Sequence, residues 1–333
     1  MKFLFLSTHF TETLIEKTQL YCIAHGIEVV RINLEDLLPN TINTVQVTIA
    51  EDDISFRLKG ETHLLSEFSL IWKRRISDNF ISTGRLFENY KNVLPKPICE
   101  KLLKEVYDLR DLILLFSKKL NLPIINDYDL ACRNKPFQII KANEFGLKSP
   151  SMLLSNSMVD LNSFISTCSA TITKPIGGLG YLSDEKEIMS IKTTSVNLNY
   201  VKDVSAELIF PSFLQERIQS KYELKCTLVG EELFCVKQYY EGGNIPTTDI
   251  KLAYRNKQIT NIEYELKPEV KGKIIKLCKY FKLDLCTMDI IKNVDGDYVF
   301  LEINPDGVVE YYSYFLSFPI YEKIFEMLQR NCK

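Results

Sequence analysis

The sequence predicts an α/β protein that begins with a parallel sheet and ends with an antiparallel one. Two apolar runs, over residues 2–7 and 27–32, flank an amphipathic segment that stops near Gly26. A β-α-β pattern of about 30 residues predicts parallel strands. Nearer the C-terminus, pairs of apolar runs flank short polar turns, and this arrangement predicts antiparallel hairpins.

The remaining elements follow from the same periodicities. Residues 44–58 alternate around the acidic turn 51–53 and predict a hairpin, and residues 70–72 predict a further strand. Apolar residues recur at spacings of three and four over residues 98–120, so we expect an amphipathic helix there. The other expected elements are helices over 135–145 and 161–166, strands over 151–154, 171–174 and 213–218, and hairpins of 224–229 with 233–238 and of 287–292 with 298–303.

Length and composition restrict the class of protein. The chain has 333 residues, of which 46% are hydrophobic and 25% charged, which is typical of a globular protein of two or three packed units. Its 41 basic residues nearly balance its 43 acidic ones, and this excludes a globally basic nucleic-acid binder. No apolar run reaches about 18 residues and no secretory signal pattern opens the chain, so we expect a cytoplasmic protein that contacts neither membrane nor nucleic acid.

Cysteine and histidine spacing excludes several chemistries. The nine cysteines are never closer than eight positions, which excludes CxxC zinc ribbons and redox pairs. The three histidines, His9, His25 and His63, all lie in the first fifth of the chain. Chemistry further along must therefore use carboxylates, amides, lysines and arginines.

A candidate metal site lies in the last predicted hairpin. Glu302 and Asn304 are two residues apart on one strand, so their side chains share a face, and Asp289 on the partner strand can face them. Three such oxygen donors suit Mg²⁺. The alternative is that these polar side chains meet solvent while their apolar neighbours fill a core.

A candidate phosphate-binding segment follows the strand over 171–174. Lys174 ends that strand and is followed by Gly177, Gly178 and Gly180. A lysine beside glycines can contact a phosphate while backbone N–H groups approach its oxygens. The loop is neither a Walker P-loop nor G-x-G-x-x-G. The alternative is an ordinary tight turn.

A third segment, residues 213–218, offers groups that could bind a nucleoside. Backbone groups at the end of this strand can read an adenine edge, and Glu223, seven residues after Glu216, can accept hydrogen bonds from ribose hydroxyls. Exposed glutamates are common on any surface, so this segment is ambiguous by itself. The order of the three segments is more informative than each alone.

That order resembles the ATP-grasp superfamily: a lysine before a helix, K-P-x-G-G-x-G, Q-E-x-I, then D…E-x-N. The resemblance covers about residues 122–307 and is greatest to the RimK-type branch. The passages 125–150, 71–75 (Ile-Trp-Lys-Arg-Arg) and 300–305 (Phe-Leu-Glu-Ile-Asn-Pro) are similar to the graspetide, or microviridin-type, synthetases. The ending Tyr311-Tyr312-Ser313-Tyr314 is similar to that of the grasp-with-spasm peptide maturases.

The resemblance implies a set of nucleotide-binding residues. Two lysines would hold the phosphates and adenine, three glycines would close over the phosphates, the hinge at residues 216–218 would read adenine, and one carboxylate would bind ribose. These residues are Lys135, Lys174, Gly177, Gly178, Gly180, Glu216, Arg217, Ile218 and Glu223.

It also implies metal ligands and catalytic residues. Asp289, Glu302 and Asn304 match the Mg²⁺ ligands, and Glu302 is expected to bridge two ions. Lys225 and Lys251 stand where relatives usually carry arginine; lysine keeps the charge but loses the bidentate fork. Arg74 or Arg75 is expected to contact the substrate or support the site, the alternative being a solvated strand end.

The implied architecture is an ATP-grasp fold: an N-terminal α/β (pre-ATP-grasp) domain over 1–120, and an ATP-grasp domain over 121–333 with a central lid subdomain at about 148–213 and a C-terminal antiparallel-sheet lobe. The implied enzyme would use ATP to convert Asp or Glu side chains of a ribosomal precursor peptide to acyl phosphates. Ser, Thr or Lys side chains would then close ω-ester or ω-amide macrocycles. A homodimer is expected from the resemblance.

Two other functions stay open at this point. One is a RimK-like ligase that adds a free amino acid to a carboxylate. The other is an ATP-binding regulatory protein without catalytic activity. The full Asp289, Glu302 and Asn304 set argues against the second, because a protein that only senses ATP has no need of all three.

Overall fold

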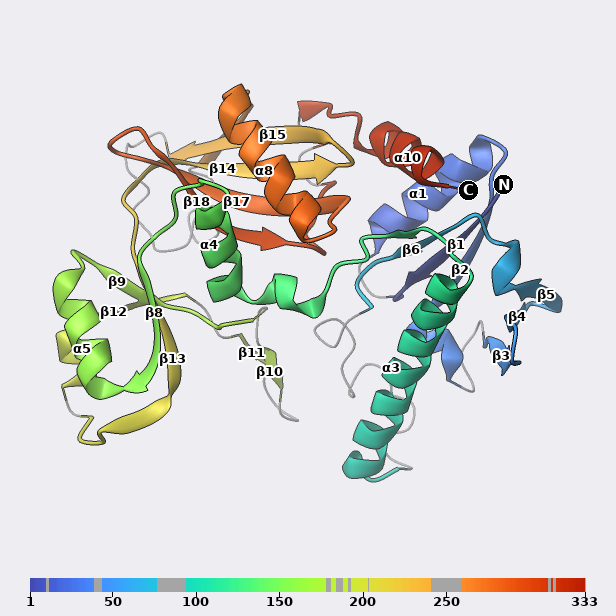
Figure 1. Cartoon of the computed structure of the whole chain (residues 1–333), viewed down its shortest axis with the longest axis horizontal. Coiled ribbons are helices and arrows are strands. Elements are labelled where there is room, and N and C mark those ends of the chain that lie inside the picture. The colour runs from blue at the N-terminus through green and yellow to red at the C-terminus, as the bar shows by residue number, and fades with distance from the viewer. Residues whose placement is uncertain are drawn as a thin grey trace. The chain divides into compact units, whose positions relative to one another are not determined.

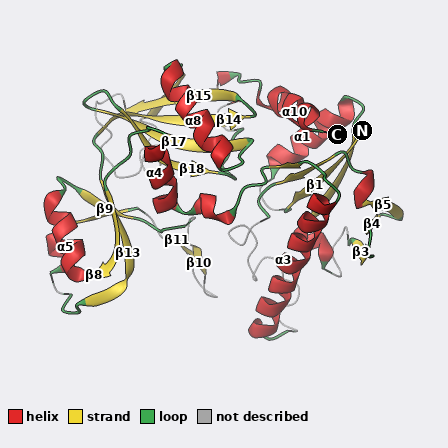
Figure 2. Cartoon of the chain, viewed as in Figure 1, coloured by secondary structure: helices red, strands yellow, loops and turns green. Residues whose placement is uncertain are grey.

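The computed structural model describes residues 1–9, 12–38, 44–76, 94–177, 181–183, 188–190, 193–202, 204–240, 259–310, 313 and 316–332. The chain divides into two compact units, one of Met1–Asp127 with Pro319–Lys333 and the other of Tyr128–Phe318. Helices and strands occur in both units (Figure 2). The chain is therefore α/β, as the sequence predicts.

The first unit contains a parallel sheet of four strands in the order β2-β1-β6-β7. Its strands are β1 (Lys2–Ser7), β2 (Glu28–Asn33), β6 (Leu70–Lys73) and β7 (Ile124–Ile125). Helix α1 (Thr13–Ala24) joins β1 to β2, which pair in parallel, so the predicted β-α-β unit is confirmed. Phe3, Leu4, Phe5 and Leu6 are buried, because a parallel sheet covered on both faces hides successive side chains.

Three further parts complete the first unit. Strands β3 (Gln46–Ile49), β4 (Ile54–Leu58) and β5 (Glu61–Leu64) form an antiparallel sheet, of which only the first hairpin is predicted from the sequence. Helix α3 runs over Lys96–Lys119, close to its predicted bounds. The short 3-10 helices are η1 (Leu34–Leu37) and η2 (Leu65–Glu67).

The C-terminal helix α10 (Ile320–Asn331) returns to the first unit and lies beside α1 (Figure 1). Its Phe325 ring lies 5.3 Å from the ring of Tyr21 and 4.7 Å from that of His25. The N-terminal and C-terminal parts of the chain therefore belong to one unit.

The second unit is built on a five-stranded antiparallel sheet in the order β16-β15-β14-β17-β18. Both predicted hairpins are confirmed: β14 pairs with β15 and β17 with β18. The strands are β14 (Ser220–Val229), β15 (Glu232–Tyr240), β16 (Ile259–Glu263), β17 (Leu285–Asn293) and β18 (Tyr298–Asn304). Helices α4 (Lys135–Glu144) and α8 (Pro268–Tyr280) cover one face of the sheet (Figure 1).

A smaller sheet of the second unit has the order β12-β9-β13-β8. Its strands are β8 (Met152–Ser157), β9 (Thr171–Thr173), β12 (Thr194–Val196) and β13 (Leu208–Glu216), with helices α5 (Met158–Thr167) and α6 (Leu198–Val201). A two-stranded sheet, β10 (Tyr181–Ser183) with β11 (Ile188–Ser190), and the 3-10 helix η3 (Leu130–Arg133) complete the unit. None of the described helices combines the length and the hydrophobicity that crossing a bilayer requires.

Candidate functional site

One face of the five-stranded sheet carries a row of charged side chains. Lys225 of β14 pairs with Asp289 of β17, and Asp289 pairs with Glu302 of β18. Their neighbours along the strands, such as Leu224 and Ile303, belong to the core under the helices. Because side chains alternate across a strand, the charged residues lie on the face opposite that core.

Asp289 and Glu302 stand directly opposite each other, as the sequence predicts for a metal site. Two like charges at opposed positions destabilise a sheet unless other groups offset them. Here each carboxylate has a lysine: Lys225 forms an ion pair with Asp289, and Nζ of Lys135 lies 3.8 Å from Oε2 of Glu302. The amide of Asn304 donates to Oε1 of Glu302 at 3.2 Å.

These charges determine the protonation states of Glu302 and Lys225. Burial alone would raise the pKa of Glu302, but Lys135, Lys174 and the Asn304 hydrogen bond together lower that pKa. Burial would likewise lower the pKa of Lys225, yet the charge and hydrogen bond of Asp289 raise it. Glu302 is therefore anionic and Lys225 cationic at neutral pH.

The segment that begins at Lys174 is attached to the start of α4. The backbone N–H of Lys135 donates to the carbonyl of Ile176 at 2.9 Å, and its Nζ donates to the carbonyl of Gly177. Burial lowers the pKa of Lys174, and the positive charge of Lys135 lowers it further, while Glu302 opposes the shift. Three lysines, at 135, 174 and 225, are thus gathered around the carboxylates of Asp289 and Glu302.

The predicted hinge follows β13. Glu216 at the end of this strand donates its backbone N–H to Ser151, and Arg217 donates its own to Ala170, both at 2.9 Å. Glu223 lies two residues before Lys225 on β14, hence on the same face of the sheet, and its charge contributes to the raised pKa of Lys225. Gln215, which the sequence analysis does not assign, is buried, and among the described residues its Nε2 has no hydrogen-bond partner.

Two further residues without a sequence assignment help build the site. Gln138 of α4 binds the backbone of Ile303, between Glu302 and Asn304. Arg133 of η3 forms an ion pair with Asp306, two residues after Asn304. Single-sequence patterns carry no signal for either contact, because each joins segments more than 160 residues apart.

Arg74 and Arg75 lie in the first unit, directly after β6. Nε of Arg74 is 3.2 Å from Oε2 of Glu12, and Nε of Arg75 is 2.8 Å from Oε1 of the same carboxylate. All three side chains are buried, so the alternative of a solvated strand end is wrong. Contact with a substrate stays a prediction for both arginines.

Several predicted residues lie outside the described part of the chain: Gly178, Gly180 and Lys251, together with the tyrosines at 311, 312 and 314. Gly177 is described. Across the described ranges no three His, Cys, Asp or Glu side chains are grouped to hold a metal ion. The predicted metal-ligand set contains only two carboxylates, and its third member is the side-chain amide of Asn304.

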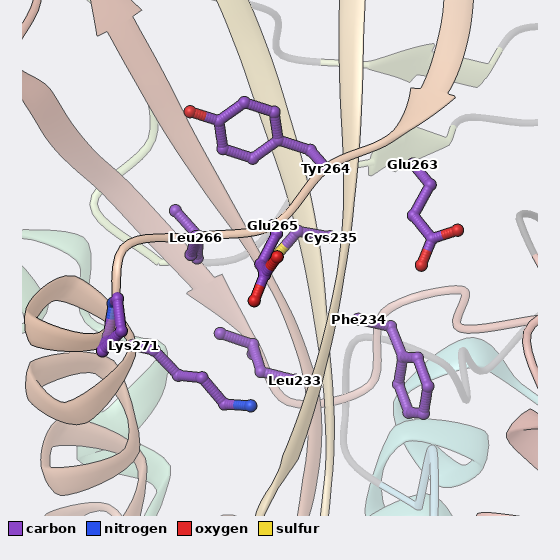
Figure 3. A pocket seen from close by; sticks show the side chains of 9 residues that line it. Leu233, Phe234, Cys235, Glu263, Tyr264, Glu265, Leu266 and Lys271 are labelled. Atoms are coloured by element: carbon purple, nitrogen blue, oxygen red, sulfur yellow. The ribbon is translucent and has the colours of Figure 1, made fainter.

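A cavity of about 530 Å³ lies elsewhere in the second unit, where the chain leaves β16 for α8. Figure 3 shows Leu233 and Phe234 of β15 projecting to opposite sides of that strand. Of the site residues that the sequence predicts and the structure describes, none lines this cavity. Its lining residues are Leu233, Phe234, Cys235, Glu263, Tyr264, Glu265, Leu266, Pro268 and Lys271.

Solved structures resemble this chain over nearly its whole length. An RiPP-associated ATP-grasp ligase from Chryseobacterium gregarium, solved with ADP and a leader and core peptide, has a TM-score of 0.80 at 21% identity and covers 99% of this chain and 96% of its own. The macrocyclase MdnC from Microcystis aeruginosa MRC, bound to the precursor peptide MdnA, has a TM-score of 0.79 at 22% identity, with coverages of 99% and 100%. The chain has the ATP-grasp fold.

A third structure agrees with this assignment. The ATP-grasp ligase PsnB, complexed with a phosphomimetic minimal precursor, Mg and ADP, has a TM-score of 0.72 at 16% identity and covers 99% of this chain and 98% of its own. No protein-family model and no curated protein matches the sequence. The ATP-grasp fold that the ordered motifs predict is therefore confirmed by structure, at sequence identities too low for the fold to be recognised from overall similarity.

Proposed function

We propose that the protein is an ATP-dependent carboxylate ligase that matures a ribosomal precursor peptide. The observation that carries this proposal is the row Lys225, Asp289 and Glu302 across the sheet, with Lys135 and Lys174 beside it. A carboxylate and the γ-phosphate of ATP repel each other, so a site that joins them needs fixed cations and a place for metal ions.

The donor set of the site fits Mg²⁺. Asp289, Glu302 and Asn304 offer oxygen ligands, and the neighbouring lysines lower the pKa of Glu302, which keeps that carboxylate anionic. When bound, Mg²⁺ would reduce the negative charge on the phosphate oxygens. Two ions are the expectation from the resemblance, with Glu302 between them.

The chain's own residues then have separate roles. Lys135 and Lys174 hold the phosphates, with Gly177, Gly178 and Gly180 closing over them. Glu216, Arg217 and Ile218 read the adenine, and Glu223 binds the ribose. No described residue accepts a hydrogen bond from the buried Nε2 of Gln215, next to this hinge, and this favours a bound group that accepts one.

Lys225 and Lys251 are proposed to orient the acceptor carboxylate against the γ-phosphate. The carboxylate oxygen attacks phosphorus, ADP leaves, and an acyl phosphate forms. A hydroxyl or amine of the same peptide then attacks the acyl carbon and releases phosphate, so an ester or amide replaces the activated bond. Arg74 or Arg75 is proposed to contact the peptide or to support the site.

The peptide substrate is supported by the solved structures that share this fold. Those of MdnC, PsnB and the Chryseobacterium gregarium ligase each hold a precursor or leader and core peptide, and the alignments span at least 96% of those chains. Asp or Glu side chains are therefore proposed as the activated carboxylates and Ser, Thr or Lys side chains as nucleophiles. We also propose that the protein is a homodimer, which light scattering would test. Its proposed location is the cytoplasm.

The deciding experiment is co-expression with the short open reading frames that neighbour this protein's gene, then incubation of each Thr-, Ser-, Asp- and Glu-rich product with Mg-ATP, followed by mass spectrometry. Each link should remove one water, a loss of about 18 Da. The Glu302→Gln variant is the matched control and should leave the peptide mass unchanged. A gain equal to one amino acid would instead support the RimK-like ligase. ATP binding without any mass change or ATP consumption would favour the regulatory protein and contradict the proposal.

A further inference from the structure

Three side chains of the second unit tie the segment before α4 to the loop after β18. Nη2 of Arg133 donates to Oη of Tyr128 at 2.7 Å and forms an ion pair with Asp306. The hydroxyl of Tyr128 donates to Oδ2 of Asp306 at 2.7 Å. The side chains of Arg133 and Asp306 are only 13% and 4% exposed, so water competes little for these contacts.

The two segments that this cluster joins carry the predicted site. Arg133 comes two residues before Lys135, and Asp306 comes two residues after Asn304. Arg133, Tyr128 and Asp306 therefore connect the start of a phosphate-binding helix to the end of a metal-binding strand. None of the three is among the predicted ligands.

The loop after β18 is also restricted from its other side. A Cβ atom added at Gly307 would collide with the side chain of Thr287, which is buried. Thr287 is the β17 partner of Asn304. The loop therefore lies against β17 through Gly307 and against the segment before α4 through Asp306.

This connection matters because Lys135 and Glu302 must exchange each other for new partners when nucleotide and metal bind. Lys135 pairs with Glu302, but in the proposed function it must hold a phosphate while Glu302 binds a cation. The exchange succeeds only if the backbones that carry both residues keep their separation. A displacement of about 1 Å in a catalytic geometry can reduce a rate by about 10²-fold.

We infer that Arg133, Asp306 and Tyr128 are positioning residues that hold Lys135 and the Glu302–Asn304 strand end at the separation that Mg²⁺ and the nucleotide phosphates require. This inference rests on the proposed assignment of Asp289, Glu302 and Asn304 as metal ligands. Residues that orient metal ligands typically change metal affinity by about 10- to 100-fold when they are replaced.

The test measures Mg²⁺-dependent ADP binding by calorimetry, with thermal unfolding as the measure of folding. Arg133→Lys keeps the charge but loses the planar guanidinium whose Nη2 contacts both Tyr128 and Asp306, so the Mg²⁺ concentration for half-maximal ADP binding should rise by about tenfold. Asp306→Asn should act similarly. Tyr128→Phe removes one oxygen atom and should give a smaller rise of about threefold. ADP binding without Mg²⁺ should change little in all three.

The matched control is Asp297→Asn. Asp297 lies at the turn of the same β17–β18 hairpin and forms an ion pair with Lys148 at 2.6 Å, and the side chains of Lys148 and Asp297 are 67% and 41% exposed. This variant should bind Mg²⁺ and ADP as the parent protein does. A rise as large as that of Asp306→Asn would show that loss of any carboxylate charge near the hairpin has the effect, and would overturn the inference.

Two outcomes separate this inference from the proposed function. If Glu302→Gln loses Mg²⁺-dependent ADP binding while Arg133→Lys and Tyr128→Phe keep the parent's Mg²⁺ dependence, the positioning role is refuted and the metal site stands. If Glu302→Gln keeps that binding, the ligand assignment fails and the positioning role fails with it. Should Arg133→Lys not fold, Tyr128→Phe decides, because it removes only the hydroxyl.

Discussion

The side-chain amide of Gln138 binds both backbone groups of Ile303. Its Nε2 donates to the Ile303 carbonyl at 2.8 Å, and its Oε1 accepts from the Ile303 N–H at 2.9 Å. Ile303 lies on β18, which is the last strand of this sheet in the described part of the chain, so its outward backbone groups need partners other than a further strand. Gln138 takes the place of that strand at Ile303, and it lies one turn after Lys135, whose Nζ is 3.8 Å from Oε2 of Glu302.

Replacing Gln138 with Leu should therefore destabilise the protein. The backbone N–H and C=O of Ile303 would each lose a buried partner, at a cost of about 1–3 kcal/mol per group. Urea unfolding should show a lower midpoint than the parent protein. Gln329→Leu on α10, where the side chain is exposed, is the control and should shift the midpoint little. Equal shifts in both variants would contradict the role of Gln138.

Replacing Glu302 with Ala should reduce turnover of ATP and peptide by roughly 10²-fold or more, because the site loses a major electrostatic stabiliser. Steady-state ADP release measures the effect. Glu263→Ala, on the exposed face of the edge strand β16, serves as the control and should keep parent turnover. Near-normal turnover in the Glu302 variant would remove Glu302 from the metal site.

Replacing Glu223 with Ala should raise the KM for ATP more than it changes kcat. Ribose binding is largely the same in the ground state and the transition state, so its loss weakens binding without slowing chemistry. Initial rates over a range of ATP concentrations give both constants. An unchanged KM would refute the assignment of Glu223 to the ribose.

In the pH profile of kcat/KM for ATP, the fall on the alkaline side should depend on Lys174. This fall is called the alkaline limb below. Burial lowers the pKa of Lys174 below its usual value of 10.5, so this lysine loses its proton as pH rises through that lowered pKa. The charge that attracts phosphate is then lost at a lower pH than for an exposed lysine. Lys174→Arg keeps its charge and should move the limb to higher pH.

The control for this pH profile is Lys292→Arg. Burial also lowers the pKa of Lys292, and neighbouring Lys267 lowers it further, but Lys292 is not among the predicted site residues. Its replacement should leave the limb where it is. If Lys292→Arg shifts the alkaline limb and Lys174→Arg does not, a group other than Lys174 controls the alkaline limb of kcat/KM for ATP.

Replacing Glu12 with Gln should destabilise the first unit. Glu12 is the shared buried partner of Arg74 and Arg75, and breaking a buried ion pair by removing one partner costs about 3–5 kcal/mol. Chemical unfolding followed by Trp72 fluorescence reports on this unit, since Trp72 is the chain's single tryptophan and is buried in β6. A parent-like unfolding curve would mean that the arginines do not depend on Glu12 and would favour a role in substrate contact.

Local patterns predicted most of the fold. The continuous apolar run over residues 2–7 is what a strand buried on both faces requires, and it forms β1. The two-residue period placed Glu302 and Asn304 on one face, and the polar turn around Asp295 placed Asp289 opposite them. These predictions succeeded because each depends on residues close together in the chain.

The sequence by itself determined the α/β class, the two C-terminal hairpins and the motif residues of the candidate site. Only the tertiary structure decided that Lys135 reaches Glu302, that Gln138 covers the edge at Ile303, and that α10 packs against α1. Each of these contacts joins segments far apart in the chain. Such contacts depend on how whole elements pack, and periodicity within one element contains no information about which distant backbone group or carboxylate its side chains will meet.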